Sequence, residues 1–324
     1  MSTWLSPAKL GPVAFRANTA GRIFTFSRFS GVFARFILGV FLLFGLLARM
    51  APSQEREGVP RRILSVAPAG TEILYDLGLG DSVVGVTMYC SWPPEAKLKK
   101  NVGDMMHLNM EVVVSLNPDL VVISNMNEHL KGSLEMMGYP VAVVYQDNFV
   151  QICDSMIRVG EACGVAASAR KRVDELRAAV RDISARSSGP PLRVLIVVGR
   201  DVDDTSFKKI YVAGVRSFYN DLLKESGVIN AFQQDAPYSQ ISLEGLLRLD
   251  PDIVIELVGE SGMTNLESSA IMKQWKSLKD LRASRDDRIA LIRGDFTLRA
   301  GPRYPLILDS FSKVIRDGVR EIYE

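Results

Sequence analysis

The side chains of this sequence that could bind a metal ion or catalyse a reaction are few, and their spacing argues against both roles. The 324 residues contain two histidines, His107 and His129. Neither has a further ligand at metal-site spacing, whereas a bare zinc or iron ion needs about three or four such side chains. The motifs of nucleotide binding, serine hydrolysis and zinc proteolysis are missing as well. We therefore expect no catalytic residue and no directly bound metal ion.

Two arginines near the end of the chain are better suited to binding. Arg299 and Arg303 carry planar guanidinium groups that could bind carboxylates or an anionic chelate. Side chains so late in the sequence can share a ligand with earlier residues only where the fold brings both to the same place. The predicted elements therefore decide which residues can meet.

Short β-branched runs alternate with helical patterns, which is typical of βαβ units around a largely parallel sheet. The expected strands span residues 63–66, 83–87, 120–124 and 141–145 in the first half, and 194–198, 210–213, 253–257 and 289–292 in the second. Ligands of such folds bind at the carboxyl ends of the strands. The segments after Thr87, Ser124, Val198 and Ile292 are thus the expected walls of a cleft.

Helical spacing marks the remaining segments. We expect a helix over residues 71–77, with Thr71 as its N-cap and Gly78 as its stop. A helix over residues 166–186 would extend about 31 Å. The closing helix is expected from about Leu306, with an apolar stripe at Leu308, Phe311, Ile315 and Ile322.

This pattern divides the chain into lobes. It predicts an N-terminal α/β lobe at residues 61–149, a helical linker at 150–188 and a C-terminal α/β lobe at 189–324. Residues 51–60 form a polar, proline-containing connector before the first lobe.

An internal repeat relates the two lobes. Residues 108–121 align without gaps on residues 241–254 at an offset of 133 (244 − 111 and 251 − 118). The repeated unit is a short helix, a Pro-Asp turn and a buried strand, in which proline ends the helix and aspartate can bond its own backbone. Glu111 and Glu244 occupy equivalent positions.

The first 50 residues resemble an export signal. They contain six basic residues and no acidic one, and residues 36–48 form an apolar run. This run is shorter than the roughly 20 residues of a bilayer span but fits a signal h-region. We expect an exported protein that acts in the periplasm or otherwise outside the cytoplasm. An uncleaved membrane anchor and a buried core helix stay open as alternatives.

The body of the chain is mildly acidic. Residues 51–324 hold 33 basic residues (39 − 6) and 37 acidic ones, a net charge of −4, which gives no reason to expect nucleic acid as a partner. Cys90, Cys153 and Cys163 form no C-x-x-C pair and are expected as small apolar core residues rather than a disulfide framework. We expect a monomer.

Several segments in order carry a family resemblance. They are residues 62–74, 77–81, 84–87 and 89–96, the Pro-Asp repeat, residues 214–230 and residues 299–303. Together they resemble the periplasmic binding proteins of ABC importers for cobalamin and ferric siderophores, over about residues 61–324. The resemblance implies two Rossmann-like α/β lobes with mostly parallel sheets, joined by a single long helix, with the ligand in a cleft between them.

The resemblance also implies a function and its contacts. The protein would capture a corrinoid or a ferric siderophore and deliver it to an ABC permease in the membrane. In that family an acidic residue on each lobe meets permease arginines, and Glu111 and Glu244 match these positions. Any metal would arrive already chelated, so no cofactor is expected.

The ligand contacts implied by the resemblance are fewer than in the cobalamin-binding member. Tyr89 matches an aromatic contact, and Tyr238 stands in place of a tryptophan. Asp295, Phe296 and Arg299 match the last pocket loop. Met105, and Ser124 or Asn125, replace two pocket tryptophans, which puts cobalamin itself in doubt.

Two other classes of function are compatible with the sequence. A membrane-tethered docking protein could keep the fold without a ligand, as the lost aromatic residues suggest. A two-lobed α/β enzyme acting on a nucleotide-type substrate is the other alternative, although no motif supports it. Binding of a metal chelate separates the first alternative from a receptor, and turnover of a nucleotide or sugar donor would indicate the second.

Overall fold

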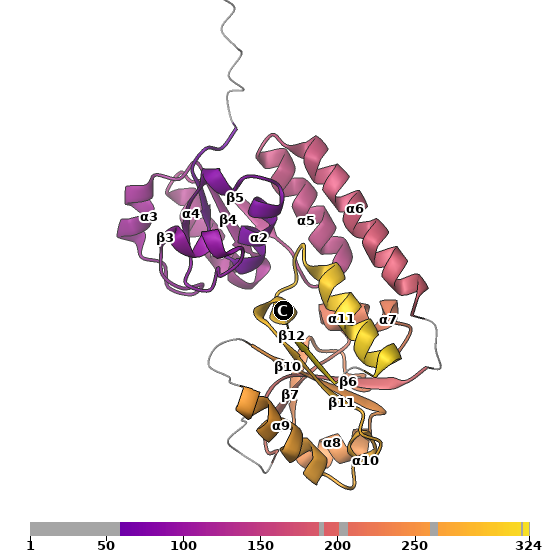
Figure 1. Ribbon diagram of the computed structural model, residues 1–324. Helices are drawn as coiled ribbons and strands as arrows, with labels where there is room; N and C mark the ends of the chain where they lie inside the picture. Colours follow the sequence, from indigo (N-terminus) through magenta and orange to yellow (C-terminus); the bar gives the residue numbers. More distant parts are fainter. Residues whose placement is uncertain (1–58, 188–190, 201–206, 260–264, 319, 324) are drawn as a thin grey trace, which may run out of the picture. The chain divides into compact units, whose positions relative to one another are not determined.

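The computed structural model describes residues 59–187, 191–200, 207–259, 265–318 and 320–323. Residues 58–324 form one compact unit. Two separate sheets carry the fold, one from each half of the chain, and helices cover them (Figure 1). This confirms the predicted α/β class. The export segment predicted within residues 1–50 lies outside the described residues.

The first sheet is entirely parallel, with strand order β3-β2-β1-β4-β5. Successive residues of its strands face opposite sides. Ile63 and Val122 pack against helices α2 and α5, whereas Leu64 and Val121 pack against α3 and α4. The elements are β1 (Ile63–Ser65), α2 (Pro68–Asp76), β2 (Val83–Val86), β3 (Lys100–Asn101), α3 (Met110–Leu116), β4 (Leu120–Ser124), α4 (Lys131–Met136), β5 (Val141–Val144) and α5 (Phe149–Ala162), with single-turn helices at Gly80–Ser82, Pro94–Leu98 and Asn125–Leu130.

The second sheet is mostly parallel, with order β12-β11-β10-β6-β7-β9 and β8 beside β6. Only the pairings of β7 are antiparallel among the described strands. Helices α7 and α11 cover one face and α8 and α9 the other (Figure 1). The elements are β6 (Arg193–Arg200), β7 (Ile210–Ala213), α7 (Phe218–Glu225), β8 (Ile229–Asn230), β9 (Tyr238–Ile241), α8 (Leu243–Leu249), β10 (Ile253–Val258), α9 (Asn265–Ser277), α10 (Arg282–Arg285), β11 (Ile289–Arg293), a single-turn helix at Asp295–Leu298, α11 (Tyr304–Asp317) and β12 (Glu321–Tyr323).

Two helices connect the sheets. The predicted helix over residues 166–186 is confirmed as α6 (Ala166–Ala185), whose stripe of Ala169, Val173 and Leu176 is buried in the main core. Helix α5 precedes it and ends at Ala162, with Cys163 as its C-cap, because Gly164 adopts a φ of +69° that breaks the helical path. The main core includes buried residues of both sheets, so these helices pack continuously from one sheet to the other.

The eight predicted strands are confirmed within a few residues, but some local predictions were wrong. Helix α2 begins earlier than expected, with Ala67 as N-cap and Pro68 in its first turn, because proline needs no hydrogen-bond partner there. Thr71 instead lies inside the helix and donates to Ser65 Oγ. The last helix ends at Gly318 in a left-handed conformation, so Ile322 belongs to β12 rather than to the helical stripe.

The internal repeat is confirmed as a structural unit. Helices α3 and α8 each begin at a side-chain cap, Asn109 and Ser242, that accepts a backbone N–H three residues later. Each ends at a left-handed residue, Asn117 or Asp250, before the Pro-Asp turn. The following strands, β4 and β10, are buried.

The expectation that the turn aspartates bond their own backbone was wrong. Asp119 accepts hydrogen bonds from the backbone N–H groups of Arg61 and Arg62, and Asp252 accepts one from Arg193. In a parallel sheet the start of the neighbouring strand lies beside the turn. The unpaired backbone N–H groups of that strand donate hydrogen bonds to the aspartate carboxylate. Arg62 and Arg193 complete the symmetry by donating their guanidinium groups to the last carbonyls of α3 and α8.

We expect Asp119→Ala to lower the free energy of unfolding by about 1 kcal/mol, because two backbone donors lose an exposed but charged acceptor. Urea denaturation followed by circular dichroism measures the change. Asp81→Ala, an exposed carboxylate in the single-turn helix at Gly80–Ser82, is the matched control. Equal losses in both variants would contradict the structural role of Asp119.

The three cysteines are buried and unpaired, as predicted for small core residues. Within the part of the chain that the structure describes, no helix combines the length and apolar character needed to cross a bilayer.

Candidate ligand-binding site

The strand order of the first sheet indicates at which edge of the sheet a ligand can bind. Strands β2 and β3 extend the sheet to one side of β1, and β4 and β5 extend it to the other. Such a reversal leaves a crevice at the carboxyl ends of the two central strands, where α/β proteins bind ligands. The loops after β2, β4 and β5 border this edge and carry Tyr89, Asn125 and Asp147.

The loop after β2 exposes apolar surface. Tyr89 has half of its surface exposed (50%), and Met88 and Trp92, its neighbours in the sequence, are also exposed. Met106, in the loop before α3, and Met126, in the single-turn helix at Asn125–Leu130, are similarly exposed. Large exposed apolar side chains can belong to a binding surface, and methionine adapts to irregular ligands. The sequence analysis identified Tyr89 and missed the exposed methionines, whose type alone predicts a core position.

Ser91, Asp295 and Arg299 form a polar cluster that joins the two halves of the chain. The Arg299 guanidinium donates to Ser91 Oγ at 2.5 Å and to the Asp295 carboxylate at 3.2 Å. Ser91 Oγ in turn donates to Asp295 at 3.3 Å. Asp295 opens the single-turn helix after β11, so the structure brings the predicted last loop against the Tyr89 loop. The charge of Arg299 is matched by Asp295.

A second group of residues surrounds Asp147. Asn125 Nδ2 donates to both carboxylate oxygens of Asp147, at 3.0 and 3.2 Å. A cavity of about 380 Å³ is lined by Asp147 and Asn148 from the first half of the chain and by Val215, Arg216, Ser217, Asp221 and Pro237 from the second. We call this hollow the Asp147 cavity. Tyr238 directly follows its lining residue Pro237 and has 47% of its surface exposed.

The chemistry of Tyr238 is that of a neutral hydrogen-bonding phenol. Partial burial of the side chain and, to a smaller extent, the nearby Asp147 carboxylate raise the pKa of Tyr238 to about 12. The hydroxyl therefore keeps its proton at physiological pH and can donate to a ligand. Its ring lies edge-on to Tyr219, with centroids 6.4 Å apart.

Tyr219 is a supporting residue that sequence reasoning missed. Its side chain is buried in α7, and its hydroxyl donates to the Thr297 carbonyl at 2.7 Å. It thereby connects the loop of Asp295 with Tyr238. Its position on the buried face of a helix predicts only core packing, so nothing in the pattern identifies this contact.

Two predicted contact residues lie differently from the others. Phe296 has no exposed surface and packs in the main core, where it anchors the loop while Asp295 and Arg299 remain outside. Met105 is half-buried in the loop before α3, where the Asp104 carboxylate accepts the backbone N–H groups of Met106 and His107. That turn exposes Met106 more than Met105.

Arg303, which the sequence suggested for an anionic ligand, is already paired. Its guanidinium donates to both oxygens of Glu72 in α2, at 3.0 and 2.6 Å, and lies over the Trp92 ring at 4.8 Å. Burial raises the pKa of the Glu72 carboxyl, while Arg303 opposes that shift. Because the partners are 231 residues apart, the pair fastens the first lobe to the loop before α11.

Glu111 and Glu244 lie in equivalent first turns of α3 and α8 and are both exposed. Glu244 forms an ion pair with Arg248 one turn later, at 2.7 Å, and keeps 81% of its side chain exposed. A carboxylate in a first helical turn is favoured by the helix dipole, and an exposed one stays available to a partner.

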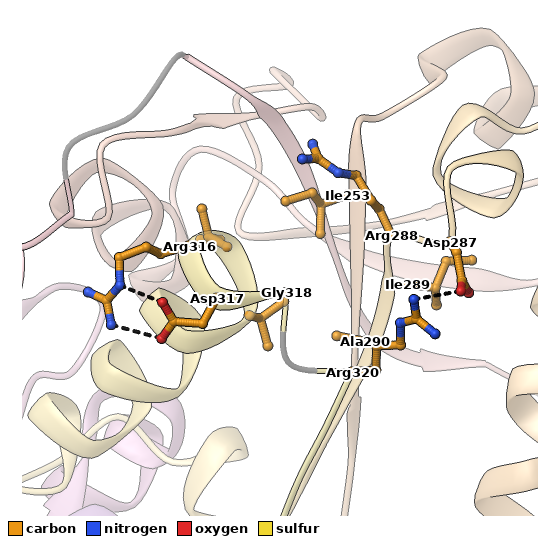
Figure 2. A pocket seen from close by; sticks show the side chains of 11 residues that line it. Ile253, Asp287, Arg288, Ile289, Ala290, Arg316, Asp317, Gly318 and Arg320 are labelled. Atoms are coloured by element: carbon orange, nitrogen blue, oxygen red, sulfur yellow. Dashed lines mark hydrogen bonds and ion pairs between the residues drawn. The ribbon is translucent and has the colours of Figure 1, made fainter.

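A further hollow of about 240 Å³ lies at the other edge of the second sheet, beside the amino ends of β10 and β11. Figure 2 shows that two of its three arginines form ion pairs, Arg316 with Asp317 and Arg320 with Asp287. Ligands of α/β sheets bind at the opposite edge, so we do not assign this hollow to the site. Among the described residues, no group of His, Cys, Asp or Glu is arranged to hold a metal ion.

Comparisons with known proteins identify chains of similar sequence and fold. A family model for periplasmic binding proteins matches residues 63–295. The chain is 30% identical over 255 residues to YvrC of Bacillus subtilis, an uncharacterized ABC transporter substrate-binding lipoprotein, covering 75% of this chain and 76% of YvrC. It is 24% identical over 269 residues to the vitamin B12-binding protein of Vibrio cholerae, covering 82% and 90% of the two chains.

A solved structure shows the same fold. It is that of a possible iron-binding, periplasmic solute-binding protein from Staphylococcus epidermidis, with a TM-score of 0.67 and 27% identity. The similarity covers 79% of this chain and 99% of that one.

Proposed function

The chain belongs to the periplasmic binding protein family, and from this premise we propose that it captures a chelated metal compound, a corrinoid or a ferric siderophore, for an ABC importer. Family membership makes it a binding protein and not an enzyme. It acts outside the cytoplasm, where such a receptor meets its ligand.

One observation supports this proposal: residues from both halves of the chain line the Asp147 cavity, and exposed aromatic and polar side chains lie in loops of the same two halves. The Asp147 cavity, Tyr89, Tyr238 and the Arg299 cluster provide large faces and a few fixed hydrogen-bonding groups. A bulky, partly flat chelate needs this combination of contact area and orientation. The relatives named for vitamin B12 and for iron support the same ligand class.

The permease partner follows from Glu111 and Glu244. They are exposed carboxylates on equivalent helices of a two-fold repeat. An importer with two related membrane halves would receive one carboxylate from each lobe, opposite one basic site on each half. Such exposed pairs orient and steer the receptor more than they bind it, since each contributes about 0–1 kcal/mol.

Binding can be detected through the protein's own fluorescence, because Trp92 is exposed beside Tyr89. We propose titrating the purified chain with corrinoids, haem and ferric siderophores, and expect saturable quenching by at least one. Trp92→Phe should lose most of that signal, which tests whether the ligand lies at this loop. Absence of any response would favour a docking protein that has lost its ligand.

We expect Tyr89→Ala and Tyr238→Ala each to weaken binding of the responding compound by about tenfold. Each variant loses an aromatic face, which contributes roughly 1–1.5 kcal/mol in such contacts. Tyr211→Ala, another partly exposed tyrosine in β7, is the matched control. Unchanged affinity in both site variants would remove Tyr89 and Tyr238 from the site.

A further inference from the structure

The arginines around the proposed site are paired with carboxylates, whereas one carboxylate, that of Asp147, has a neutral partner. Each of three arginines at the site faces a carboxylate: Arg299 faces Asp295 at 3.2 Å, Arg303 faces Glu72 at 2.6 Å, and Arg216 faces Asp235 at 3.2 Å. Arg299 and Arg303 are largely buried in these pairs and offer little free positive charge to an incoming anion, whereas the Arg216 pair is exposed to solvent.

Asp147 differs from the other carboxylates of the site. The side-chain partner that the structure gives it is Asn125, whose amide donates two hydrogen bonds and carries no charge. Asp221, the other acidic residue of the cavity, lies 3.9 Å from Lys224. Among the described residues that line the Asp147 cavity, Arg216 and Asp221 each have a partner of opposite charge, whereas no ion pair is found for Asp147.

The position of Asp147 makes this charge relevant to a ligand. The residue is exposed at the cavity, where residues from both halves of the chain meet. The Asp147 carboxylate adds to the effect of burial in raising the pKa of Tyr238, the aromatic residue proposed to contact the ligand. The bonds from Asn125 hold the carboxylate in place, so little ordering is needed on binding.

We propose that Asp147 selects the ligand by charge, so that the site takes cationic or neutral metal chelates and rejects polyanionic ones. This inference rests on the proposed function and narrows its ligand class. Ferric triscatecholates, which are strongly anionic, would be excluded. Cobinamide-type corrinoids and hydroxamate chelates, which are cationic or neutral, would be accepted.

The test uses probes of similar chemistry and different charge. The purified chain is titrated with aquocyanocobinamide, a cation, and with dicyanocobinamide, its neutral form, and likewise with ferrioxamine B, ferrichrome and ferric enterobactin, which are cationic, neutral and anionic. Within the corrinoids or the siderophores, whichever class binds, we expect the cationic probe to bind at least as tightly as the neutral one. Ferric enterobactin, the anionic probe, should bind most weakly or not at all.

Variants then assign the preference to one residue. Asp147→Asn keeps the shape and should weaken cation binding roughly fivefold, and Asp147→Lys roughly 30-fold, while the neutral form changes less. Asp81→Asn, a distant exposed carboxylate, should change none of these affinities.

The outcomes separate the inference from the proposed function. Tight binding of ferric enterobactin by the unchanged protein, or equal losses for cationic and neutral probes in Asp147→Asn, would overturn charge selection and leave the receptor function standing. If no probe binds, the result contradicts both the proposed receptor function and charge selection by Asp147.

Discussion

Reversing the charge of both Glu111 and Glu244 to arginine is expected to leave ligand affinity unchanged and to reduce uptake to background. Both side chains are exposed in the first turns of α3 and α8. They belong to neither the Asp147 cavity nor the Arg299 cluster. Reversal replaces two attractive contacts with two repulsive ones, and juxtaposed like charges cost several kcal/mol at an interface.

The experiment compares affinity and transport in the same strains. Affinity is measured on the purified variant, and uptake of the labelled ligand is measured in cells that depend on this receptor. The matched control reverses Glu135 and Glu175, two surface glutamates on α4 and α6, and should transport normally. Normal uptake by the Glu111 and Glu244 double variant would remove the permease assignment.

Replacing Glu72 by alanine is expected to lower the free energy of unfolding by about 3–5 kcal/mol. Glu72 is 3% exposed and accepts two hydrogen bonds from Arg303, whose side chain is 12% exposed. Removing one member of a buried ion pair leaves the other charge without compensation. Guanidinium or urea denaturation at neutral pH measures the loss.

The control for Glu72 is a similar pair nearer to solvent. Asp76 accepts two hydrogen bonds from Arg172, but Arg172 keeps 36% of its side chain exposed. Asp76→Ala should therefore cost about 1 kcal/mol or less. If both variants lose the same stability, the Glu72–Arg303 pair does not fasten the lobes as we infer.

Local patterns explain what could be predicted from the sequence. The helix, Pro-Asp turn and strand of the repeat depend on neighbouring residues, so the pattern identified α3, α8, β4 and β10 from spacing alone. Likewise, β-branched runs marked the long buried strands. Strands β3, β8, β9 and β12 were missed. Strands β3 and β8 have two residues each, which are too few to show a periodicity. Ile322 of β12 was assigned to the closing helix.

Contacts between distant residues explain what could not be predicted. An arginine such as Arg303 can bind an anionic ligand, and only the fold shows that its guanidinium is already paired with Glu72. Phe296 follows Asp295 directly, yet one ring enters the core while the neighbouring carboxylate faces Ser91. Asp147 was not identified from the sequence, because an isolated acidic residue in a loop shows no pattern. Its proposed role depends on Asn125, Tyr238 and the cavity, which only the fold brings together.

Isothermal titration calorimetry with chelated and free metals tests the central claim most directly. The purified chain is titrated with corrinoids, haem and ferric hydroxamates, and separately with free ferric and zinc ions. We predict one-to-one binding of at least one chelate and no tight binding of either free ion. Tight binding of a free ion, or heat of binding from none of the chelates, would contradict a receptor for chelated metal compounds.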